Sequence, residues 1–226
     1  MWAAADMEYK LTENPNMPTK EQMEQALIDR VGPEVQRRLS GATVAICGLG
    51  GLGSNVAVSL ARAGVGTLIL IDFDRVDITN LNRQQYKLTQ LGQEKSTALV
   101  DNLREINPYL HYLPHTAKVT EENLRQLVGE SDVVCEAFDR ADQKSMLVNA
   151  VLEQLPQTVL VSASGMAGLD SGNTIRTRRV TRRFYLCGDG VSDVETLGSL
   201  FAPRVALCAA HQALTVLRVL TNQFDE

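Results

Sequence analysis

A short glycine-rich segment carries the clearest chemical signal in this sequence. Residues 48–53 read GLGGLG, so Gly48, Gly50 and Gly53 form a GxGxxG pattern. Without Cβ atoms, backbone N–H groups can approach phosphate oxygens closely, and the amino end of a following helix adds about half a positive charge. The segment, Gly51 included, therefore predicts a phosphate-binding loop. The pattern occurs in many proteins, so its flanks decide its meaning.

The flanks match those of a nucleotide-binding loop. Residues 42–47 are an apolar run typical of a strand buried on both faces, and residues 52–63 carry one apolar helical stripe ending at Gly64. Asp72 follows a second buried strand, nineteen residues after Gly53, where a carboxylate can accept hydrogen bonds from ribose hydroxyls. The alternative is a tight turn and a strand end without a ligand. The order of a strand, a glycine turn, a helix and then an acidic residue favours the interpretation as a nucleotide-binding site.

The segment after Asp72 indicates which nucleotide is bound. It places Asn80, Arg83 and Gln84 at the carboxyl end of a strand, and Lys95 at the next helix start. A nicotinamide needs an apolar ring pocket, whereas a triphosphate needs several fixed donors, and the two cations supply these. In the alternative interpretation, Arg83 only pairs with a surface acid and Lys95 only occupies an exposed helix start.

The order of elements predicts an α/β fold with a doubly wound, mostly parallel, Rossmann-like sheet. We expect residues 1–20 to be an irregular tail, and residues 21–226 to form one domain that begins with two short helices within 21–39. Beyond Ser164 we expect a glycine-rich, partly antiparallel extension, followed by a long apolar helix. The expected strands are 42–47, 67–73, 111–119, 132–137 and 158–163, and the expected helices 52–63, 96–106, 121–128, 142–154 and 203–220.

Composition excludes several classes of protein. The chain has 226 residues, with 22 basic and 27 acidic side chains and a net charge of −5. No diffuse basic field exists to attract nucleic acid, and no apolar run approaches the roughly 20 residues that span a bilayer. The amino-terminal residues do not form a secretory signal. We therefore expect a cytoplasmic protein without membrane or nucleic-acid partners.

The four cysteines do not form a metal-binding pattern. They are dispersed, without a CxxC pair, so we predict no zinc and no disulfide framework. Cys187 differs from the others because Gly188 and Asp189 follow it, which predicts a loop with an accessible thiol. A packed, unreactive thiol is the alternative. The cysteines are Cys47, Cys135, Cys187 and Cys208.

These residues together resemble the ThiF/MoeB/HesA family, the bacterial relatives of ubiquitin-activating enzymes. The resemblance rests on the GxGGLGS segment, a following DxDxVxxxNLxRQ segment, a later lysine and an apolar strand ending in Asp, within residues 35–165. A divergent ThiF-type member is the nearest pattern. The resemblance implies ATP-dependent adenylation of the C-terminal glycine carboxylate of a small ubiquitin-like sulfur carrier ending in Gly-Gly. Pyrophosphate is released, and thiamine biosynthesis is the expected setting.

The resemblance also implies residue roles. Gly51 backs the phosphate loop, Asp72 holds the ribose, Lys95 stabilises the α-phosphate, and Asp139 holds Mg²⁺ between phosphate oxygens. Asn80, Arg83 and Gln84 bind the triphosphate. A carboxylate is already ionised near neutral pH, so its attack on phosphorus needs charge neutralisation and alignment rather than a general base. For Asp139, capping the helix that begins near Ala141 is the alternative.

The sequence departs from the family in two ways. It lacks the two CxxC pairs that hold zinc in well-known members. An arginine that such members present to the partner subunit falls at Gln25 or a neighbour, which leaves Arg30, Arg37 or Arg38 as substitutes. Cys187 lies where some relatives carry a thiol that joins the carrier. A homodimer is implied, and the apolar helix at 203–220 either forms that contact or covers its own sheet.

Other functions remain open at this stage. Within the family, the substrate could instead be a molybdopterin carrier or the threonylcarbamoyl carboxylate of a tRNA, although the acidic charge balance argues against tRNA. Outside it, a regulatory module that binds a nucleotide without turnover would carry the same loop. Carrier-dependent pyrophosphate exchange separates the enzyme from the module.

Overall fold

Seven strands form a single sheet in the computed structural model, which describes residues 16–223. The strand order is β3-β2-β1-β4-β5-β7-β6, and every neighbouring pair is parallel except β6 with β7. The predicted doubly wound sheet with an antiparallel end is therefore confirmed. The strands are β1 (Thr43–Cys47), β2 (Thr67–Ile71), β3 (His111–His115), β4 (Val133–Glu136), β5 (Val159–Ala163), β6 (Arg176–Thr181) and β7 (Phe184–Gly188).

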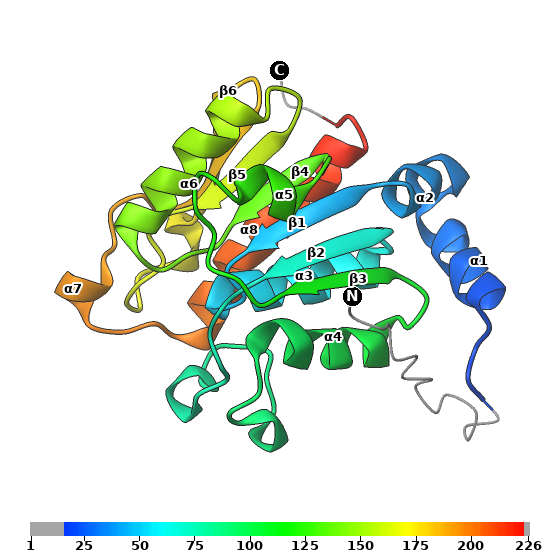
Figure 1. Cartoon of the computed structure of the whole chain (residues 1–226), viewed down its shortest axis with the longest axis horizontal. Helices are drawn as coiled ribbons and strands as arrows, with labels where there is room; N and C mark the ends of the chain where they lie inside the picture. Colours follow the sequence, from blue (N-terminus) through cyan, green and yellow to red (C-terminus); the bar gives the residue numbers. More distant parts are fainter. Residues whose placement is uncertain (1–15, 224–226) are drawn as a thin grey trace.

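Helices cover both faces of the sheet (Figure 1). One hydrophobic core lies between the sheet and α3, α4 and α8, and a second lies between the opposite face and α5 and α6. The helices are α1 (Lys20–Val31), α2 (Pro33–Ser40), α3 (Gly51–Ala63), α4 (Lys95–Ile106), α5 (Leu124–Val128), α6 (Ala141–Gln154), α7 (Val194–Leu197) and α8 (Ala202–Leu220), with short 3-10 turns η2 (Ile78–Asn80), η3 (Leu88–Gln90) and η4 (Gly172–Thr174).

Strand β1 shows why the sheet needs helices on both sides. Val44 and Ile46 point into the first core, whereas Ala45 and Cys47 point into the second, and all four are fully buried. Side chains alternate across a strand, so an apolar residue at every position demands two apolar layers. Because β1 lies between β2 and β4, the chain reverses its direction across the sheet at β1. Ligands of open α/β sheets bind at such a point, outside the carboxyl ends of the strands.

The amino-terminal helices form as the sequence predicts. Thr19 and Gln22 make a capping box at the start of α1, and Gly32 ends that helix with φ 85° before Pro33 opens α2. The side chains of α1 are not buried, so this helix adds little to the core. Of the predicted irregular tail, residues 1–15 lie outside the described residues, and α1 begins at Lys20.

The carboxyl-terminal part corrects one prediction. Residues 184–188, including Cys187, form strand β7 rather than a loop. Tyr185 and Cys187 point into the core under α8, and α8 packs on α3. The glycine that follows Cys187 ends the strand instead of exposing the thiol. None of the helices in residues 16–223 combines the length and apolar character needed to cross a membrane.

Candidate active site

The glycine loop joins β1 to α3 in a space where side chains do not fit. Gly48 has φ +91°, and a Cβ on it would lie 2.8 Å from the Ala137 carbonyl oxygen. A Cβ on Gly53 would lie 1.8 Å from the Gly48 carbonyl oxygen. The loop is therefore pressed against α3 and the end of β4. Since α3 begins at Gly51, its unpaired N–H groups lie at this turn, as an anion site requires.

A cavity of about 730 Å³ opens beside the loop at the carboxyl ends of the strands. Nearly all the predicted nucleotide-site residues line it: Gly48, Gly50, Gly51, Asp72, Asn80, Arg83, Gln84, Lys95 and Asp139. Gly53 lies beneath the cavity within α3 and acts through close packing. Cys187 does not belong to the lining.

Asp72 follows β2 and is largely buried. Its carboxylate accepts hydrogen bonds from the backbone N–H of Leu49 (2.7 Å) and that of Asp74 (2.8 Å). Burial raises the pKa of Asp72, and the nearby Lys95 ammonium together with these two N–H groups offsets part of that rise. The side chain thus fastens the glycine loop to the end of β2. Its position in the cavity wall also places the carboxylate beside any ligand bound there.

Lys95 begins α4 with its side chain almost completely enclosed. The ammonium Nζ lies 2.9 Å from Asp74 Oδ2, in an ion pair whose lysine side chain is 6% exposed and whose aspartate is 50% exposed. The Tyr86 hydroxyl, also buried, donates to the Leu49 carbonyl (2.8 Å) and so connects this region to the glycine loop. The lysine is therefore held at a fixed place in the cavity wall, with a partner that remains in contact with water.

Arg83 reaches the cavity from the loop that follows β2. Its Nη1 donates to the Asn82 side-chain oxygen (2.8 Å) and the Thr79 carbonyl (3.2 Å). Within residues 16–223 it forms no ion pair, so the alternative pairing with a surface acid is not observed. A guanidinium without a carboxylate partner remains available for an anionic ligand.

Two amide side chains lie beside Arg83. Asn80 ends the short η2 turn and lines the cavity. Gln84 is largely buried, and its side-chain oxygen has no hydrogen-bond partner among the described residues. A buried amide atom left unpaired costs free energy, so a ligand that supplies the missing hydrogen bond would be favoured here.

Asp139 lies in the turn between β4 and α6. The helix cap is Arg140 rather than Asp139, so the capping alternative is wrong. The turn is held by Glu136, a fully buried carboxylate that accepts hydrogen bonds from the Phe138 N–H (2.7 Å) and from Ser162 Oγ (2.5 Å). Lys144 Nζ lies 3.0 Å from Glu136 Oε2 and donates to the Ala163 carbonyl (2.9 Å).

This Glu136 network was missed by the sequence analysis. It ties the end of β4 to the end of β5, the two strand ends that support this side of the cavity. A glutamate inside the otherwise apolar run of residues 133–138, eight residues before a lysine, is the signal that would have identified it.

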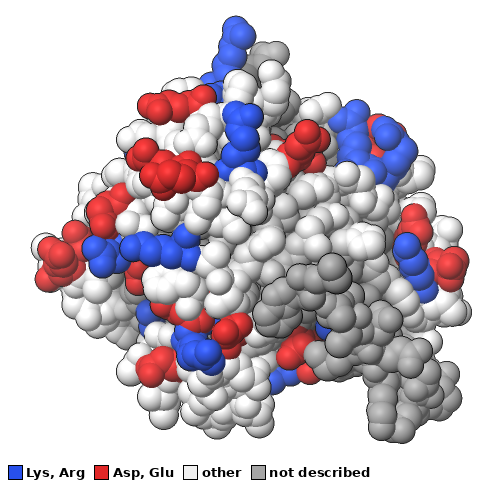
Figure 2. Space-filling model, viewed as in Figure 1, with Lys and Arg blue, Asp and Glu red and all other residues white. Residues whose placement is uncertain are grey.

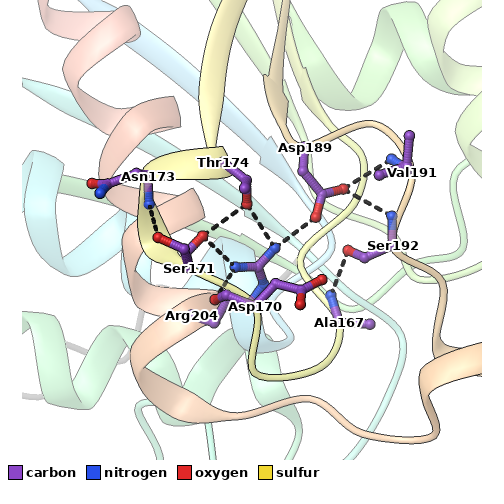
Figure 3. Close-up of polar contacts among 9 residues, drawn as sticks. All are labelled: Ala167, Asp170, Ser171, Asn173, Thr174, Asp189, Val191, Ser192 and Arg204. Atoms are coloured by element: carbon purple, nitrogen blue, oxygen red, sulfur yellow. Dashed lines mark hydrogen bonds and ion pairs between the residues drawn. The ribbon is translucent and has the colours of Figure 1, made fainter.

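A second buried ion pair supports the far wall of the cavity (Figure 3). Arg204 Nη2 lies 2.6 Å from Asp189 Oδ2, and both side chains are 5% exposed. The same guanidinium donates to the carbonyls of Asp170 (2.6 Å) and Ser171 (3.0 Å). Three segments, residues 170–174, residues 189–192 and α8, are thus held together.

Asp189 is also the centre of a turn. Its Oδ1 accepts the backbone N–H groups of Val191 and Ser192 (both 2.8 Å), and Ser192 Oγ accepts the Ala167 N–H (3.0 Å). Burial opposes ionisation of this carboxyl, but the hydrogen bonds from Ser192, Val191 and Arg204 outweigh it and lower the pKa. Because Ala167 and Ser192 line the cavity, the cluster fixes the shape of this wall. An arginine near the start of a mainly apolar helix was the available sequence signal.

Cys187 is fully buried among the residues of β7 and α8. Its sulfur lies 3.6 Å from Thr177 Oγ1 and 3.9 Å from Thr215 Oγ1, and burial raises the pKa of the thiol. Such surroundings disfavour the thiolate needed for reaction. All four cysteines are free and buried.

The arginines considered for a contribution to a partner subunit lie on α1 and α2. Arg37 and Arg38 both form ion pairs with Glu34, at 2.9 Å in each case. Gln25 donates to Asp29 (2.7 Å). Arg30 forms no ion pair within the described part of the chain and lies in the last turn of α1.

The sequence matches the family model described as ThiF family over residues 23–226. That range contains the glycine loop and every residue placed around the cavity. The chain belongs to the ThiF family.

Curated relatives of this ThiF-family chain carry related names. It is 35% identical over 224 residues to the adenylyltransferase and sulfurtransferase uba4 of Aspergillus terreus, covering 89% of this chain and 44% of the relative. It is 32% identical over 139 residues to the sulfur carrier protein adenylyltransferase of Thermus thermophilus, covering 59% of this chain and 51% of the relative. The chain thus spans about half the length of these relatives.

Solved structures show the same fold. The E. coli tRNA N6-threonylcarbamoyladenosine dehydratase in complex with ATP superposes with a TM-score of 0.80 at 21% identity, covering 90% of this chain and 95% of that chain. E. coli MccB with ATP gives a TM-score of 0.67 at 23% identity, covering 85% of this chain and 59% of that chain. At such identities the likeness concerns the fold of the ThiF-family chain.

Proposed function

We propose that this ThiF-family protein uses ATP to adenylate the C-terminal glycine carboxylate of a small ubiquitin-like sulfur carrier. The observation that carries the proposal is the convergence of the glycine loop, Arg83, Lys95 and Asp139 on one cavity at the strand-order reversal. Curated relatives named as adenylyltransferases, one of them for a sulfur carrier protein, support the same reaction.

The chemistry follows from the donors in the cavity. A carboxylate oxygen of the carrier attacks the α-phosphorus of ATP, the bond from that phosphorus to the bridging oxygen breaks, and pyrophosphate leaves with the electron pair. No proton has to be removed from the nucleophile. Lys95 and the loop N–H groups stabilise the charge on the α-phosphate, while Arg83 with Asn80 and Gln84 holds the leaving phosphates. Asp72 orients the ribose.

Asp139 fits a role as magnesium ligand. Its carboxylate lines the cavity and makes no hydrogen bond or ion pair with the other described residues. Mg²⁺ is usually held by one or two carboxylates together with substrate phosphates and water, so a single free aspartate beside a triphosphate is a sufficient protein contribution. When bound, the ion would neutralise charge on the phosphates.

Pyrophosphate exchange tests the enzymatic function. The enzyme should incorporate labelled pyrophosphate into ATP only when a carrier ending in Gly-Gly is present. A carrier lacking its last glycine serves as the matched control. ATP binding without exchange for every carrier offered would instead establish the nucleotide-binding module.

We place the reaction in thiamine biosynthesis, on the likeness to the divergent ThiF-type pattern. A molybdopterin carrier and the threonylcarbamoyl group of tRNA are the alternative substrates. On the face shown in Figure 2, basic and acidic side chains are interspersed, which does not favour a long polyanion. Exchange with each purified carrier in parallel, and with unmodified and threonylcarbamoylated tRNA, distinguishes the three.

The proposal includes a homodimer. Helix α8 exposes Leu207 and Leu214, at 37% and 56%, on its outer side, and apolar residues on one helix face suit a subunit contact. Arg30 would then be the residue of α1 available to a partner's site. Analytical ultracentrifugation of the wild type and of Leu214→Glu tests this, since the variant should sediment as a monomer.

A further inference from the structure

The exposed edge strand of the sheet concentrates positive charge. All six residues of β6 are exposed, and residues 176–183 contain five arginines and no acid. The chain as a whole carries more acidic than basic side chains. A local cationic surface on an acidic protein attracts a partner of opposite charge at that place rather than everywhere.

Two of the three arginines in β6 are available to a partner. Arg183 donates to the carbonyls of Leu155 and Thr158, and Arg179 lies with its guanidinium 5.8 Å from the centre of the Tyr185 ring. In contrast, the side chains of Arg176 and Arg178 make no hydrogen bond or ion pair among residues 16–223.

The side chains of Arg176 and Arg178 lie on the same face of the sheet. The residue between them, Thr177, contacts His211 of α8, with its Oγ1 3.1 Å from the ring Nδ1. Side chains alternate along a strand, so Arg176 and Arg178 point away from α8. Opposite Arg178 on β7 is Leu186, which is only partly buried. The available cations therefore flank a partly apolar sheet surface.

This surface lies next to the cavity. Arg176 pairs in register with Gly188, and the preceding residue, Cys187, pairs with Ala163 at the end of β5, directly before the cavity-lining Ser164. Adjacent strands are about 4.8 Å apart, so about 10 Å separates the backbones of β6 and β5. An extended chain advances about 3.3 Å per residue, so about three residues cover that distance.

The connection between the surface and the cavity is held in a fixed shape. Arg178 Nη2 lies 3.7 Å from the position of a Cβ on Gly190, so the arginine borders the turn centred on Asp189. That turn is held by the buried Arg204 pair, and its Ser192 lines the cavity (Figure 3). A partner seated on β6 would meet a preformed path toward the nucleotide.

The open strand edge favours a protein over a nucleic acid. β6 is the last strand of the sheet, and no described strand pairs with its outer side. The backbone N–H and C=O groups along that side match those of another peptide strand, which is a recurring mode of recognition. A nucleic acid offers no such alternating partners.

We propose that β6, with Arg176 and Arg178, is the surface on which an acidic face of the folded carrier docks, so that its C-terminal tail enters the cavity past Ser164. This inference rests on the proposed function for the identity of the partner. The edge strand holds the globular part, and the cavity holds the tail. Docking would lower the KM for the folded carrier without touching the phosphates.

Charge reversal tests the docking surface. The variant R176E/R178E is compared with K20E/R62E, a double charge reversal on α1 and α3 outside the cavity lining. The probes are fluorescently labelled bacterial ubiquitin-like carriers ending in Gly-Gly and a synthetic peptide of the last six residues of each. Anisotropy gives the Kd for the folded carrier, and pyrophosphate exchange gives kcat and KM.

The expected result is specific to the folded carrier. R176E/R178E should raise its Kd and KM at least tenfold, leave the KM for ATP and the peptide-driven exchange within about twofold, and weaken the dependence of Kd on salt. An unchanged Kd of R176E/R178E for the folded carrier would overturn the inference. An equal loss of carrier binding in K20E/R62E, or an equal loss of peptide-driven exchange in R176E/R178E, would also overturn it. So would loss of tRNA binding in R176E/R178E with carrier Kd intact. Arginine-dependent carrier binding without exchange would keep the docking surface and reject adenylation.

Discussion

Replacing Lys95 with Met tests the assignment of the α-phosphate contact. Lys95 is enclosed, so the methionine side chain would occupy nearly the same space and keep the packing of the lysine stem. The change removes the ion pair with Asp74, whose side chain is 50% exposed. An aspartate left in contact with water is not a buried unpaired charge. Loss of such a pair costs about 1 kcal/mol of unfolding free energy or less. The change also removes the ammonium that offsets part of the burial of Asp72, whose carboxylate keeps its two backbone N–H partners, so a further moderate loss of stability is expected.

The expected loss of activity is much larger. A fixed donor aimed at charge that develops in the transition state contributes about 3 to 4 kcal/mol, which corresponds to a decrease of kcat by roughly 10² to 10³. K95M should therefore remain folded, with a denaturant midpoint moderately below that of the wild type, and exchange pyrophosphate at least a hundredfold more slowly. The KM for ATP should change little, because the contact strengthens in the transition state.

The matched control is Lys87→Met. Lys87 also forms an ion pair, at 2.7 Å with Glu105, but it is half exposed and lies outside the cavity lining. K87M should exchange pyrophosphate at the wild-type rate. Exchange by K95M within tenfold of the wild-type kcat, at saturating ATP and carrier, would refute the role assigned to Lys95.

Other variants address the remaining parts of the site. Arg83→Ala should lower kcat/KM in the exchange assay, because several kcal/mol of transition-state stabilisation are lost, and Arg83→Lys should recover part of the activity. Near-normal exchange by Arg83→Ala would contradict the phosphate contact. Arg204→Met should cost about 3–5 kcal/mol in urea unfolding because it leaves Asp189 buried and unpaired, and adding Asp189→Asn should restore part of this; additive losses would exclude their coupling. Folding lowers the pKa of Asp189, so the ionised carboxylate stabilises the folded protein at pH values above its ordinary pKa of about 3.9. This stabilisation is lost as the pH falls through the lower pKa of the folded state. The difference in unfolding free energy between the wild type and D189N should therefore shrink over that pH range. Cys187→Ser should retain exchange, and complete loss would show that the thiol takes part.

Patterns that act over short distances made most of the fold predictable. The apolar run before Gly48 and the stripe ending at Gly64 each depend on neighbours within one element, and both elements form where expected. The glycine loop needed no tertiary information, because the close approach of Gly53 to Gly48 lies within a single turn. The alternation of strands and helices predicted a doubly wound, mostly parallel sheet, whereas the strand order came from the structure.

Features that depend on distant contacts were not predictable in the same way. Cys187 became part of a strand because β6 and β5 pair on either side of it, which the adjacent glycine concealed. The Glu136 network spans β4, β5 and α6, and the Arg204 pair joins α8 to two loops. In the two polar networks the sequence shows a charged residue within an apolar segment, but it does not show which residue is the partner.

The pairing of β1 with β4 has a consequence for how the protein is made. Val44 lies beside Val133, and the residues between them must leave the ribosome before the two strands can meet. At about 5–20 residues per second, this takes on the order of 5–20 s. During that interval the apolar segments of β1 and β2 have no completed sheet to join, and such segments aggregate readily. Production of this protein should therefore benefit from low temperature, which weakens the association of apolar segments, and from chaperones that bind nascent chains.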